Sequence, residues 1–587
     1  MSAVGLKVEW RDGILILTLA HPPANELSPG LRAGLIEALA TPDAKGVVIA
    51  AEGPNFSAQL PLDPDSGSPS LADLARAVAD CPVPVVAVLQ GLVTGPAAEL
   101  VLAARARLAG PGLRIAFPEV TLGLCPAGGA TQRLPRLVGA KEALRLLLGG
   151  KAIPAAEALA LGLIDGITET APVASAVRLA GALAVGDILR RAEPDPAAWT
   201  AAVAEARQGA QAQGLAGRRI VDCVEAALVL PSDSAQAFET VARADLQETA
   251  EALGLVAAAR AERCALALPP VLARLQPLTV DRVGLVGTSP DLVRIAIAAL
   301  SRGLSVAWAF PDSATQEAGV AAVEAGIGDG LRAGQLTPDR ARRMTDRLAA
   351  VEGPFAPQSV PLLIGDPAAM GGEGWVDLPG AARLVLGGQA EEMGLALAPG
   401  GRVCEITLPA DSLPLARATA LAGLRRIGLA PVLVGHRPVL GARMADAGRT
   451  ALAWMVSRGV PRRVISAALD DFGARAPDPV SIEVPTILRA MSAVEVLNRW
   501  LAALANEGAR LLDEGIAKRP SDIDHIMVAG YQFPRRQGGP MHQAARRGLM
   551  VLRQDLRNWG AEASLWSPAP LIDRLIRDGQ GLEALDR

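Results

Sequence analysis

The chain has 587 residues, of which half are hydrophobic and a fifth are charged, a composition typical of a folded protein of several domains. The 57 basic and 61 acidic residues leave a net charge of −4, and only 3% of residues are aromatic. Neither a nucleic-acid surface nor a platform for stacking bases is therefore expected. The five cysteines are odd in number and widely spaced, which argues against a disulfide framework or a zinc site and favours a reducing cytoplasm.

Membrane and export signals are not expected. The charged residues Lys7, Glu9 and Arg11 lie where a secretory signal would need an apolar core. The longest uncharged run, from Cys81 to Ala98, is interrupted by prolines and glycines, so it does not read as a bilayer-spanning helix. We therefore expect a soluble protein.

Apolar runs and helical stretches alternate through the first 175 residues, which predicts an α/β architecture. The predicted strands and extended segments are 14–20, 46–51, 84–89 and 113–116, and the predicted helices are 31–40, 97–104, 140–149 and 154–161. From about 175 to 275 the pattern is helical, with prolines as breaks, and we interpret this stretch as a helical linker.

The second half opens with another α/β pattern. A buried strand at 283–287, a helix starting at Asp291 and a strand at 304–310 predict a βαβ unit. After about residue 435 the strands stop. Two helical stretches, 457–473 and 513–530, end alike and indicate a duplicated helical domain.

Two carboxylates in the first half are candidates for acid–base chemistry. Glu99 lies early in the helix predicted from residue 97, and Glu119 follows the extended segment that ends at 116. Their positions allow convergence, and a pair of carboxyl groups can supply a base and an acid. On spacing alone, each can equally be a solvated acid near a helix start, where the dipole contributes about 0.3–1 kcal/mol.

The block at 90–165, from QGLVTGPAAEL to EALALGLID, and LAHPPANELSP at 19–29 resemble the crotonase family of enoyl-CoA hydratases and isomerases. The resemblance implies a spiral of ββα units that binds an acyl-CoA thioester and stabilises its enolate. It also implies catalytic roles for Glu99 and Glu119. Hydration needs a base for the water and an acid for the neighbouring carbon, whereas isomerisation needs one shuttling base, so the pair favours a hydratase.

The same resemblance implies an oxyanion hole of two backbone N–H groups. One would come from Leu60, and the other from a position that is Pro96 in this chain. Proline has no N–H, and the loss of one such donor typically costs about 10²–10³ in rate. Either the N–H of Ala97 takes over, or the site binds acyl-CoA and turns it over poorly. Pro61 is a second departure in the same loop.

The second half resembles the 3-hydroxyacyl-CoA dehydrogenases, most clearly in NEGARLLDEGIAKRPSDIDHIMVAGYQFPRRQGGPMHQA at 506–544. The order of the two halves resembles the multifunctional β-oxidation enzymes. A dinucleotide-binding turn would read G-x-G-x-x-G. This chain keeps Gly287 but has Ser289 and Leu292 at the other glycine positions, with Asp291 between them, so pyrophosphate binding is expected to fail.

The remaining dehydrogenase positions are altered as well. Phe310 stands where the ribose-binding acid belongs, and Ala396 matches the histidine of the catalytic His–Glu pair. The glutamate of that pair is matched by Glu405, and a family asparagine by Ala442. We therefore expect neither NAD binding nor dehydrogenase activity, and no metal cofactor.

These observations predict an α/β multidomain chain that hydrates trans-2-enoyl-CoA and carries an inactive dehydrogenase half. Two alternatives stay open, a non-catalytic acyl-CoA-binding or scaffold protein and an enoyl-CoA isomerase. The expected partners are the acyl-CoA substrate and, by analogy, other β-oxidation enzymes. The predicted domains are a crotonase spiral (1–175), a helical linker (176–278), a degenerate Rossmann-like domain (279–435) and two helical C-terminal domains (436–485 and 486–587).

Overall fold

The chain divides into two compact units, Met1–Val256 (unit 1) and Ala257–Arg587 (unit 2). Each has a hydrophobic core of its own. The computed structural model describes residues 5–40, 43–58, 62, 67–185, 195–353, 360–370, 379–388, 391–475 and 490–586.

Unit 1 is built around a largely parallel sheet. Among its described residues, six strands pair in the order β1-β2-β3-β4-β6-β9, and β1 with β2 is the antiparallel pair. The inner strands β3 and β4 consist almost entirely of Val, Ile, Leu and Ala and are buried except for the last residue of β3, as a parallel sheet covered by helices requires. The strands are β1 (Leu6–Arg11), β2 (Ile14–Leu19), β3 (Gly46–Ala51), β4 (Val85–Leu89), β6 (Ala106–Ala109) and β9 (Gly166–Ile167).

A second, smaller sheet in unit 1 consists of β5 (Leu92–Thr94), β7 (Arg114–Ala116) and β8 (Ile153–Pro154) within the described ranges. β5 and β7 are parallel, and β8 is antiparallel to β7. The helices between the strands are α1 (Pro29–Leu39), α2 (Leu71–Ala79), α3 (Pro96–Ala103), the 3-10 helix η1 (Glu119–Leu122), α4 (Ala130–Val138), α5 (Ala140–Gly149), α6 (Ala155–Ala160) and α7 (Pro172–Ala184). The predicted alternation of strands and helices is confirmed.

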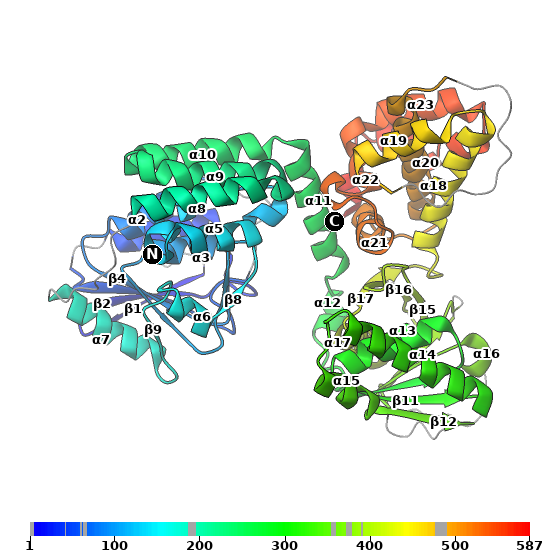
Figure 1. Ribbon diagram of the computed structural model, residues 1–587, viewed down its shortest axis with the longest axis horizontal. Coiled ribbons are helices and arrows are strands. Elements are labelled where there is room, and N and C mark those ends of the chain that lie inside the picture. Colours follow the sequence, from blue (N-terminus) through cyan, green and yellow to red (C-terminus); the bar gives the residue numbers. More distant parts are fainter. Residues whose placement is uncertain are drawn as a thin grey trace. The chain divides into compact units, whose positions relative to one another are not determined.

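The stretch interpreted as a linker is largely part of unit 1, which corrects that interpretation. α8, α9 and α10 form a helical layer that packs on α4 and α5, and Figure 1 shows this layer beside α5. The reason is apolar burial, since Trp199, Ile220 and Val224 on these helices are at most 3% exposed. The helices are α8 (Pro196–Gly209), η2 (Ala210–Gln213), α9 (Gly214–Val229), α10 (Ser232–Gln247) and α11 (Ala250–Ala265), and α11 spans the boundary between the units.

Unit 2 begins with a Rossmann-like sheet, as predicted. In its described part, eight strands pair in the order β12-β11-β10-β13-β14-β15-β16-β17, parallel except for β15 with β16. The first four follow the 3-2-1-4 order of a dinucleotide-binding sheet. The strands are β10 (Arg282–Val286), β11 (Ser305–Phe310), β12 (Leu348–Glu352), β13 (Leu362–Gly365), β14 (Ala382–Leu386), β15 (Gly394–Leu397), β16 (Val403–Thr407) and β17 (Ala430–Val434).

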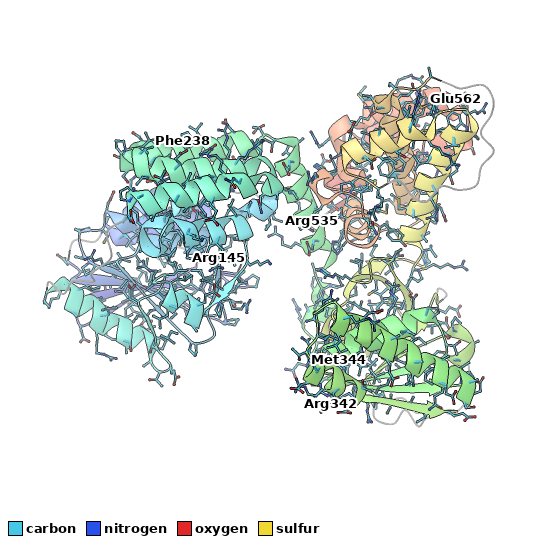
Figure 2. The ribbon with its side chains drawn as sticks, in the orientation of Figure 1. Arg145, Phe238, Arg342, Met344, Arg535 and Glu562 are labelled. Atoms are coloured by element: carbon cyan, nitrogen blue, oxygen red, sulfur yellow. The ribbon has the colours of Figure 1, made fainter. Side chains whose placement is uncertain are left out.

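Helices cover this sheet through amphipathic faces. On α15, Met344 is buried in the core and Arg342 is exposed, and Figure 2 labels both side chains. The helices of this part are α12 (Pro270–Ala273), α13 (Pro290–Ser301), α14 (Ser313–Arg332), α15 (Pro338–Thr345), α16 (Pro367–Met370) and α17 (Pro414–Ile427).

After β17 the described chain is helical, again as predicted. Helices from both predicted C-terminal domains contribute to one continuous hydrophobic core, which includes Met455 on α18 and Leu504 on α20. Within the described residues, no helix is both long and apolar enough to cross a membrane. The elements are α18 (Leu440–Ser457), α19 (Arg462–Phe472), α20 (Ala493–Asp513), α21 (Pro520–Gly530), η3 (Arg535–Gln537), α22 (Pro540–Arg547), α23 (Leu549–Gly560), η4 (Ser564–Trp566), α24 (Pro570–Arg577) and η5 (Leu582–Asp586).

Candidate active site

The two predicted catalytic glutamates lie at the same edge of the small sheet in unit 1. Thr94 at the end of β5 pairs with Ala116 at the end of the parallel strand β7, so the residues that follow both strands emerge side by side. Glu99 lies in the first turn of α3, and Glu119 begins η1. Their side chains are 1% and 4% exposed. The structure therefore brings the two carboxyl groups together in a buried site.

The Glu99 carboxylate is held by the loop that precedes α4. Its oxygens accept hydrogen bonds from the N–H groups of Ala127 at 3.2 Å, Gly128 at 2.6 Å and Ala130 at 3.3 Å. A Cβ at position 128 would lie 3.1 Å from the Glu99 Cβ, so glycine permits this close approach. Burial, followed by the charge of Glu119, raises the pKa of Glu99, and the N–H bonds act in the opposite direction.

The environment of Glu119 differs from that of Glu99, because neither carboxyl oxygen of Glu119 has a hydrogen-bond partner among the described residues. Burial raises the pKa of Glu119 to about 7, and its own backbone N–H, followed by the positive charge of Arg243, counteracts part of this effect. A carboxyl group with this pKa is protonated in about half of the molecules at neutral pH, and the protonated form can release its proton during a reaction. The two glutamates thus differ in environment, as an acid and a base do in one site.

Sequence reasoning missed a third buried glutamate, Glu239 on α10, which is 0% exposed. It accepts hydrogen bonds from the N–H of Gly129 at 2.7 Å, the N–H of Thr131 at 3.0 Å and the Thr131 hydroxyl. Burial raises its pKa. No local pattern marks this residue, because it lies in a helix without motif signals and reaches the site only through tertiary packing.

The predicted oxyanion hole is described in part. Pro96 is the first residue of α3, after Gly95 with φ +55°, a conformation that favours glycine. The Gly95 N–H donates to the Ala116 carbonyl at 3.2 Å, so it is committed to the sheet. Ala97 is the second helical residue, where an N–H has no partner within its helix. Leu60 and Pro61 lie outside the described residues.

Comparison with known proteins decides the family of this region. Residues 9–192 match the family model described as enoyl-CoA hydratase/isomerase. Unit 1 carries a crotonase domain. Its ββα arrangement and the order of its sequence blocks agree with the predicted resemblance.

The whole chain is similar to multifunctional relatives of this crotonase domain. The peroxisomal bifunctional enzyme of Danio rerio is 25% identical over 97% of this chain and 96% of its own. That of Cavia porcellus is 38% identical, over 28% of this chain and 24% of its own. A crystal structure of an enoyl-CoA hydratase from Mycobacterium avium subsp. paratuberculosis is 25% identical, covering 42% of this chain and 96% of its own with a TM-score of 0.33.

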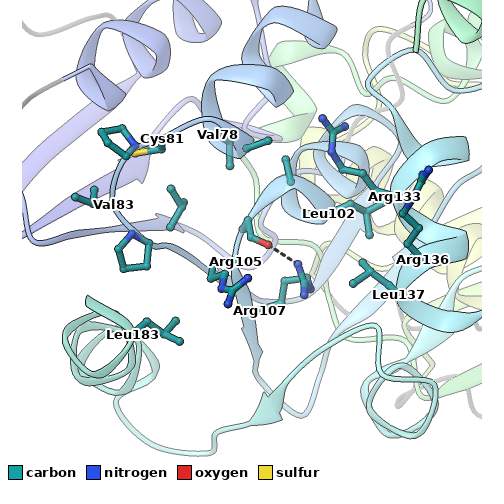
Figure 3. Close-up of a pocket in the computed structure, with 16 residues that line it drawn as sticks. Val78, Cys81, Val83, Leu102, Arg105, Arg107, Arg133, Arg136, Leu137 and Leu183 are labelled. Atoms are coloured by element: carbon teal, nitrogen blue, oxygen red, sulfur yellow. Dashed lines mark hydrogen bonds between the residues drawn. The ribbon is translucent and has the colours of Figure 1, made fainter. Parts of the chain in front are cut away.

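The crotonase domain also has a pocket of about 510 Å³ that none of the predicted site residues lines. It lies at the C-terminal end of α3, and Figure 3 shows its arginines, Arg105, Arg107, Arg133 and Arg136, beside apolar residues such as Leu102. Arg133 connects this pocket to the glutamates, because its Nη1 donates to the Gly128 carbonyl at 2.6 Å. The pocket is therefore distinct from the carboxylate site but shares one of its supporting residues.

The dinucleotide-type turn of unit 2 contains an acidic residue that sequence reasoning missed. The Asp366 carboxylate, at the end of β13, accepts hydrogen bonds from the N–H groups of Thr288 at 2.6 Å and Ser289 at 3.0 Å. A Cβ at Gly287 would lie 2.2 Å from the Asp366 Oδ2. Asp291, which was expected to oppose pyrophosphate binding, forms an ion pair with Arg294 at 2.8 Å. These backbone donors at the start of α13 are thus already bound by a carboxylate of the chain itself.

Two further positions that were matched to dinucleotide-binding residues hold hydrophobic side chains that pack in the core. Leu292 is 0% exposed and lies in the core between α13 and the sheet. Phe310 is 2% exposed and stacks on Trp308, with ring centroids 4.6 Å apart. Hydrophobic side chains therefore occupy these places.

The positions matched to the catalytic dehydrogenase residues gather at the start of α18. Ala396 lies directly opposite Glu405 in the antiparallel pair of β15 and β16. The Glu405 carboxylate accepts the N–H groups of Leu440 at 2.7 Å and Gly441 at 2.8 Å, and burial raises its pKa to about 7. Ala442 is exposed in the first turn of that helix. Glu405 thus caps a helix, and no side-chain base stands at position 396.

The cysteines are all free thiols, as their spacing predicted. Cys125 and Cys223 are buried in unit 1, and Cys404 is buried in unit 2. Within the described part of the chain, no group of three or more His, Cys, Asp and Glu side chains is placed to hold a metal ion.

Proposed function

We propose that the crotonase domain hydrates trans-2-enoyl-CoA to 3-hydroxyacyl-CoA. The observation that carries this proposal is the unequal state of two neighbouring buried carboxyl groups. Three N–H donors hold the Glu99 oxygens, whereas the Glu119 oxygens have no described partner and the pKa of Glu119 is about 7. Water addition needs one carboxylate and one carboxylic acid, and we assign these roles to Glu99 and Glu119, respectively.

In the proposed reaction, Glu99 acts as the base. The three N–H bonds favour the ionised form of this side chain, and they act against burial and the charge of Glu119, which raise its pKa. Glu99 takes a proton from water as the water oxygen bonds to the β-carbon of the thioester. A lone pair of the water oxygen forms the new C–O bond and the C=C π electrons move into an enolate. These electrons then form the new C–H bond at the α-carbon with the proton that Glu119 gives. Exchange of protons with solvent then restores Glu99 as the base and Glu119 as the acid.

The start of α3 supports the enolate in this proposal. Pro96 offers no N–H, so we assign the donor on this side to Ala97, with the positive end of the helix dipole behind it. Leu60 would supply the second donor, and that assignment stays a prediction from the family resemblance. The placement is consistent with oxyanion holes in general, where fixed backbone donors stabilise charge that develops in the transition state.

The test is incubation of the purified protein with a short and a long trans-2-enoyl-CoA, following the loss of enoyl absorbance and identifying the product. A 3-hydroxyacyl-CoA product supports hydration. A shifted double bond in place of a hydroxyl would identify an isomerase. Tight binding of acyl-CoA without turnover would identify a binding or scaffold protein, the alternative that Pro96 favours.

Because Ala97 is assigned as the donor, Pro96→Gly should leave kcat for hydration nearly unchanged, whereas a rise of up to about 10²-fold would show that the donor was missing and that the new backbone N–H supplies it. Loss of the fixed proline φ should cost roughly 0.4–1 kcal/mol of stability, too little to hide such a gain. Steady-state kinetics on the folded variant measure the effect. An unchanged kcat would show that Ala97 already supplies the donor.

For unit 2 we propose that the dehydrogenase-like half neither binds NAD nor transfers hydride. A dinucleotide pyrophosphate needs free N–H groups at the start of the helix after the first strand. Here the Asp366 carboxylate accepts those of Thr288 and Ser289, and Phe310 offers no hydrogen bond to a ribose. The residues do not fit the dinucleotide, and Ala396 provides no base for a 3-hydroxyl group.

Calorimetric titration with NAD should therefore give no binding heat at micromolar concentrations, and 3-hydroxyacyl-CoA should not reduce NAD. Asp366→Ala is an informative companion, because it frees the Thr288 and Ser289 N–H groups and should increase binding of inorganic pyrophosphate. Micromolar NAD affinity or hydride transfer in the native protein would contradict this proposal.

The cellular location of the protein and its association with other enzymes stay predictions. The free cysteines favour a cytoplasmic location, whereas the Danio rerio and Cavia porcellus relatives are named as peroxisomal. Association with other β-oxidation enzymes is proposed by analogy with the multifunctional relatives. Fractionation of the source cells, followed by affinity capture, tests both statements.

A further inference from the structure

We propose that Glu239 is a positioning residue of the hydration site, which fixes loop 127–131 and thereby the orientation of the Glu99 carboxylate. This inference rests on the proposed hydration and extends it to a residue of the helical layer. Glu239 is not assigned to touch the substrate. It acts through the loop that it shares with Glu99.

The backbone of this loop is divided between the two carboxylates. The N–H groups of Ala127, Gly128 and Ala130 bond to Glu99. Those of Gly129 and Thr131 bond to Glu239. The five consecutive N–H groups of residues 127–131 therefore bond to two carboxylates, one on α3 and one on α10. A shift of one carboxylate must move the N–H groups that bond to the other. Buried N–H groups without acceptors are strongly unfavourable, which makes this arrangement rigid.

α10 is attached to the loop at two points, and both come from the same face of the helix. Arg243, one turn after Glu239, donates from Nη1 to the carbonyl of Cys125, just ahead of the loop. Phe238, labelled in Figure 2, lies at the outer surface of α10 and is 36% exposed. The inner face of α10 therefore holds both ends of the segment that presents donors to Glu99.

The charges around Glu239 link it to the acidity of the site. The titratable and charged groups that face it or its neighbours are Glu99 on α3, Glu119 on η1, Cys125 before the loop, Arg133 on α4, Cys223 on α9 and Arg243 on α10. After burial and the charge of Glu119, the negative charge of Glu239 also raises the pKa of Glu99 and so makes Glu99 a stronger base. Removal of this charge should lower the pH at which Glu99 ionises.

Two substitutions separate the geometry from the charge. Glu239→Gln keeps the size of the side chain but places an NH₂ group against a backbone N–H, so kcat should fall by about 10²-fold. Because a negative charge is lost, the acidic limb of the kcat profile should move to lower pH. Glu239→Asp keeps the charge but is one methylene too short to reach both donors, so kcat should fall while the acidic limb stays in place.

Asp524→Asn is the matched control. Asp524 is also a buried carboxylate that accepts two N–H groups at a helix start, those of Met541 at 2.7 Å and His542 at 3.0 Å, but it lies in unit 2. Hydration should be unchanged in this variant. Native kcat and an unmoved acidic limb in folded Glu239→Gln would overturn the inference, and so would native kcat in Glu239→Asp if the glutamine variant does not fold.

Amide hydrogen exchange tests the loop without turnover, and it separates this inference from the proposed function. The amides of residues 127–131 should be protected in the native protein and lose protection in Glu239→Gln. If the native protein hydrates no enoyl-CoA, this loss of protection still supports the positioning of the loop and only the hydratase proposal fails. Unchanged protection in the variant would overturn the positioning role.

Discussion

Glu119→Gln and Glu99→Gln should each lower kcat for enoyl-CoA hydration by about 10²–10⁴-fold, the range for removing one general acid or base. Glutamine at position 119 has no proton to give to the α-carbon, and at position 99 it cannot accept one from water. Stopped-assay kinetics with trans-2-enoyl-CoA measure the loss. Binding of the CoA ester, followed by calorimetry, should persist because both carboxyls act in the chemical step.

The pH dependence of the hydration rate tests whether Glu119 acts as the acid. Because burial raises the pKa of Glu119 to about 7, the protonated acid is present below that pH and is lost above it. The rate should therefore fall as the pH rises through about 7. Glu142→Gln is a suitable control, since Glu142 is a surface residue of α5 paired with Arg145, which Figure 2 labels. Near-native turnover in either site variant would contradict the two-carboxylate mechanism.

Arg499→Ala should lower the free energy of unfolding of unit 2 by about 2–5 kcal/mol, the range for truncating a large buried side chain to alanine. Arg499 on α20 is 2% exposed. Its guanidinium lies 5.2, 4.9 and 5.3 Å from the ring centroids of Trp454, Trp559 and Trp566. Nη2 donates to Glu562, labelled in Figure 2, at 2.8 Å. Alanine would leave a cavity between three indole rings and remove these contacts together.

Urea denaturation followed by tryptophan emission measures this change, because the three indoles report directly on the site. Arg332→Ala is the control, since the side chains of Arg332 and its partner Asp329 are 73% and 74% exposed and such pairs contribute little. The free energy of unfolding of Arg499→Lys should lie between those of the native protein and Arg499→Ala. Lysine keeps the positive charge but lacks the planar group that stacks on indole. Equal stability of native and Arg499→Ala would contradict the expected role.

The sequence was informative where function depends on neighbours along the chain. Glu119 follows the extended segment predicted at 113–116 and Glu99 lies early in a predicted helix, but spacing alone left a solvated role open for each. The family resemblance, not the strand pattern, predicted that the two carboxyl groups act together. The alternation of strands and helices likewise predicted both α/β parts. β1 was not predicted, although Leu6, Val8 and Trp10 alternate with charged residues as in a strand, and all of its residues except Leu6 are exposed.

The sequence was uninformative where a contact joins distant segments. Glu239 bonds to Thr131 across 108 positions, and Asp366 bonds to Ser289 across 77. Neither glutamate nor aspartate stands out in its own segment, because an isolated acid in a helix or after a strand is usually solvated. The helical layer was interpreted as a linker for the same reason, since its apolar face is weakly patterned and its packing surface lies on α4 and α5.

The long interval between loop 127–131 and α10 affects how the chain matures during synthesis. A ribosome delivers the loop well before Glu239, and domains form as their segments emerge. Until α10 arrives, the Gly129 and Thr131 N–H groups lack the acceptors they have in the finished protein. A fragment that stops at residue 192, where the family match ends, lacks them as well. We therefore expect nascent and truncated chains to lack hydratase activity, which should appear only when the helical layer of α8, α9 and α10 is complete.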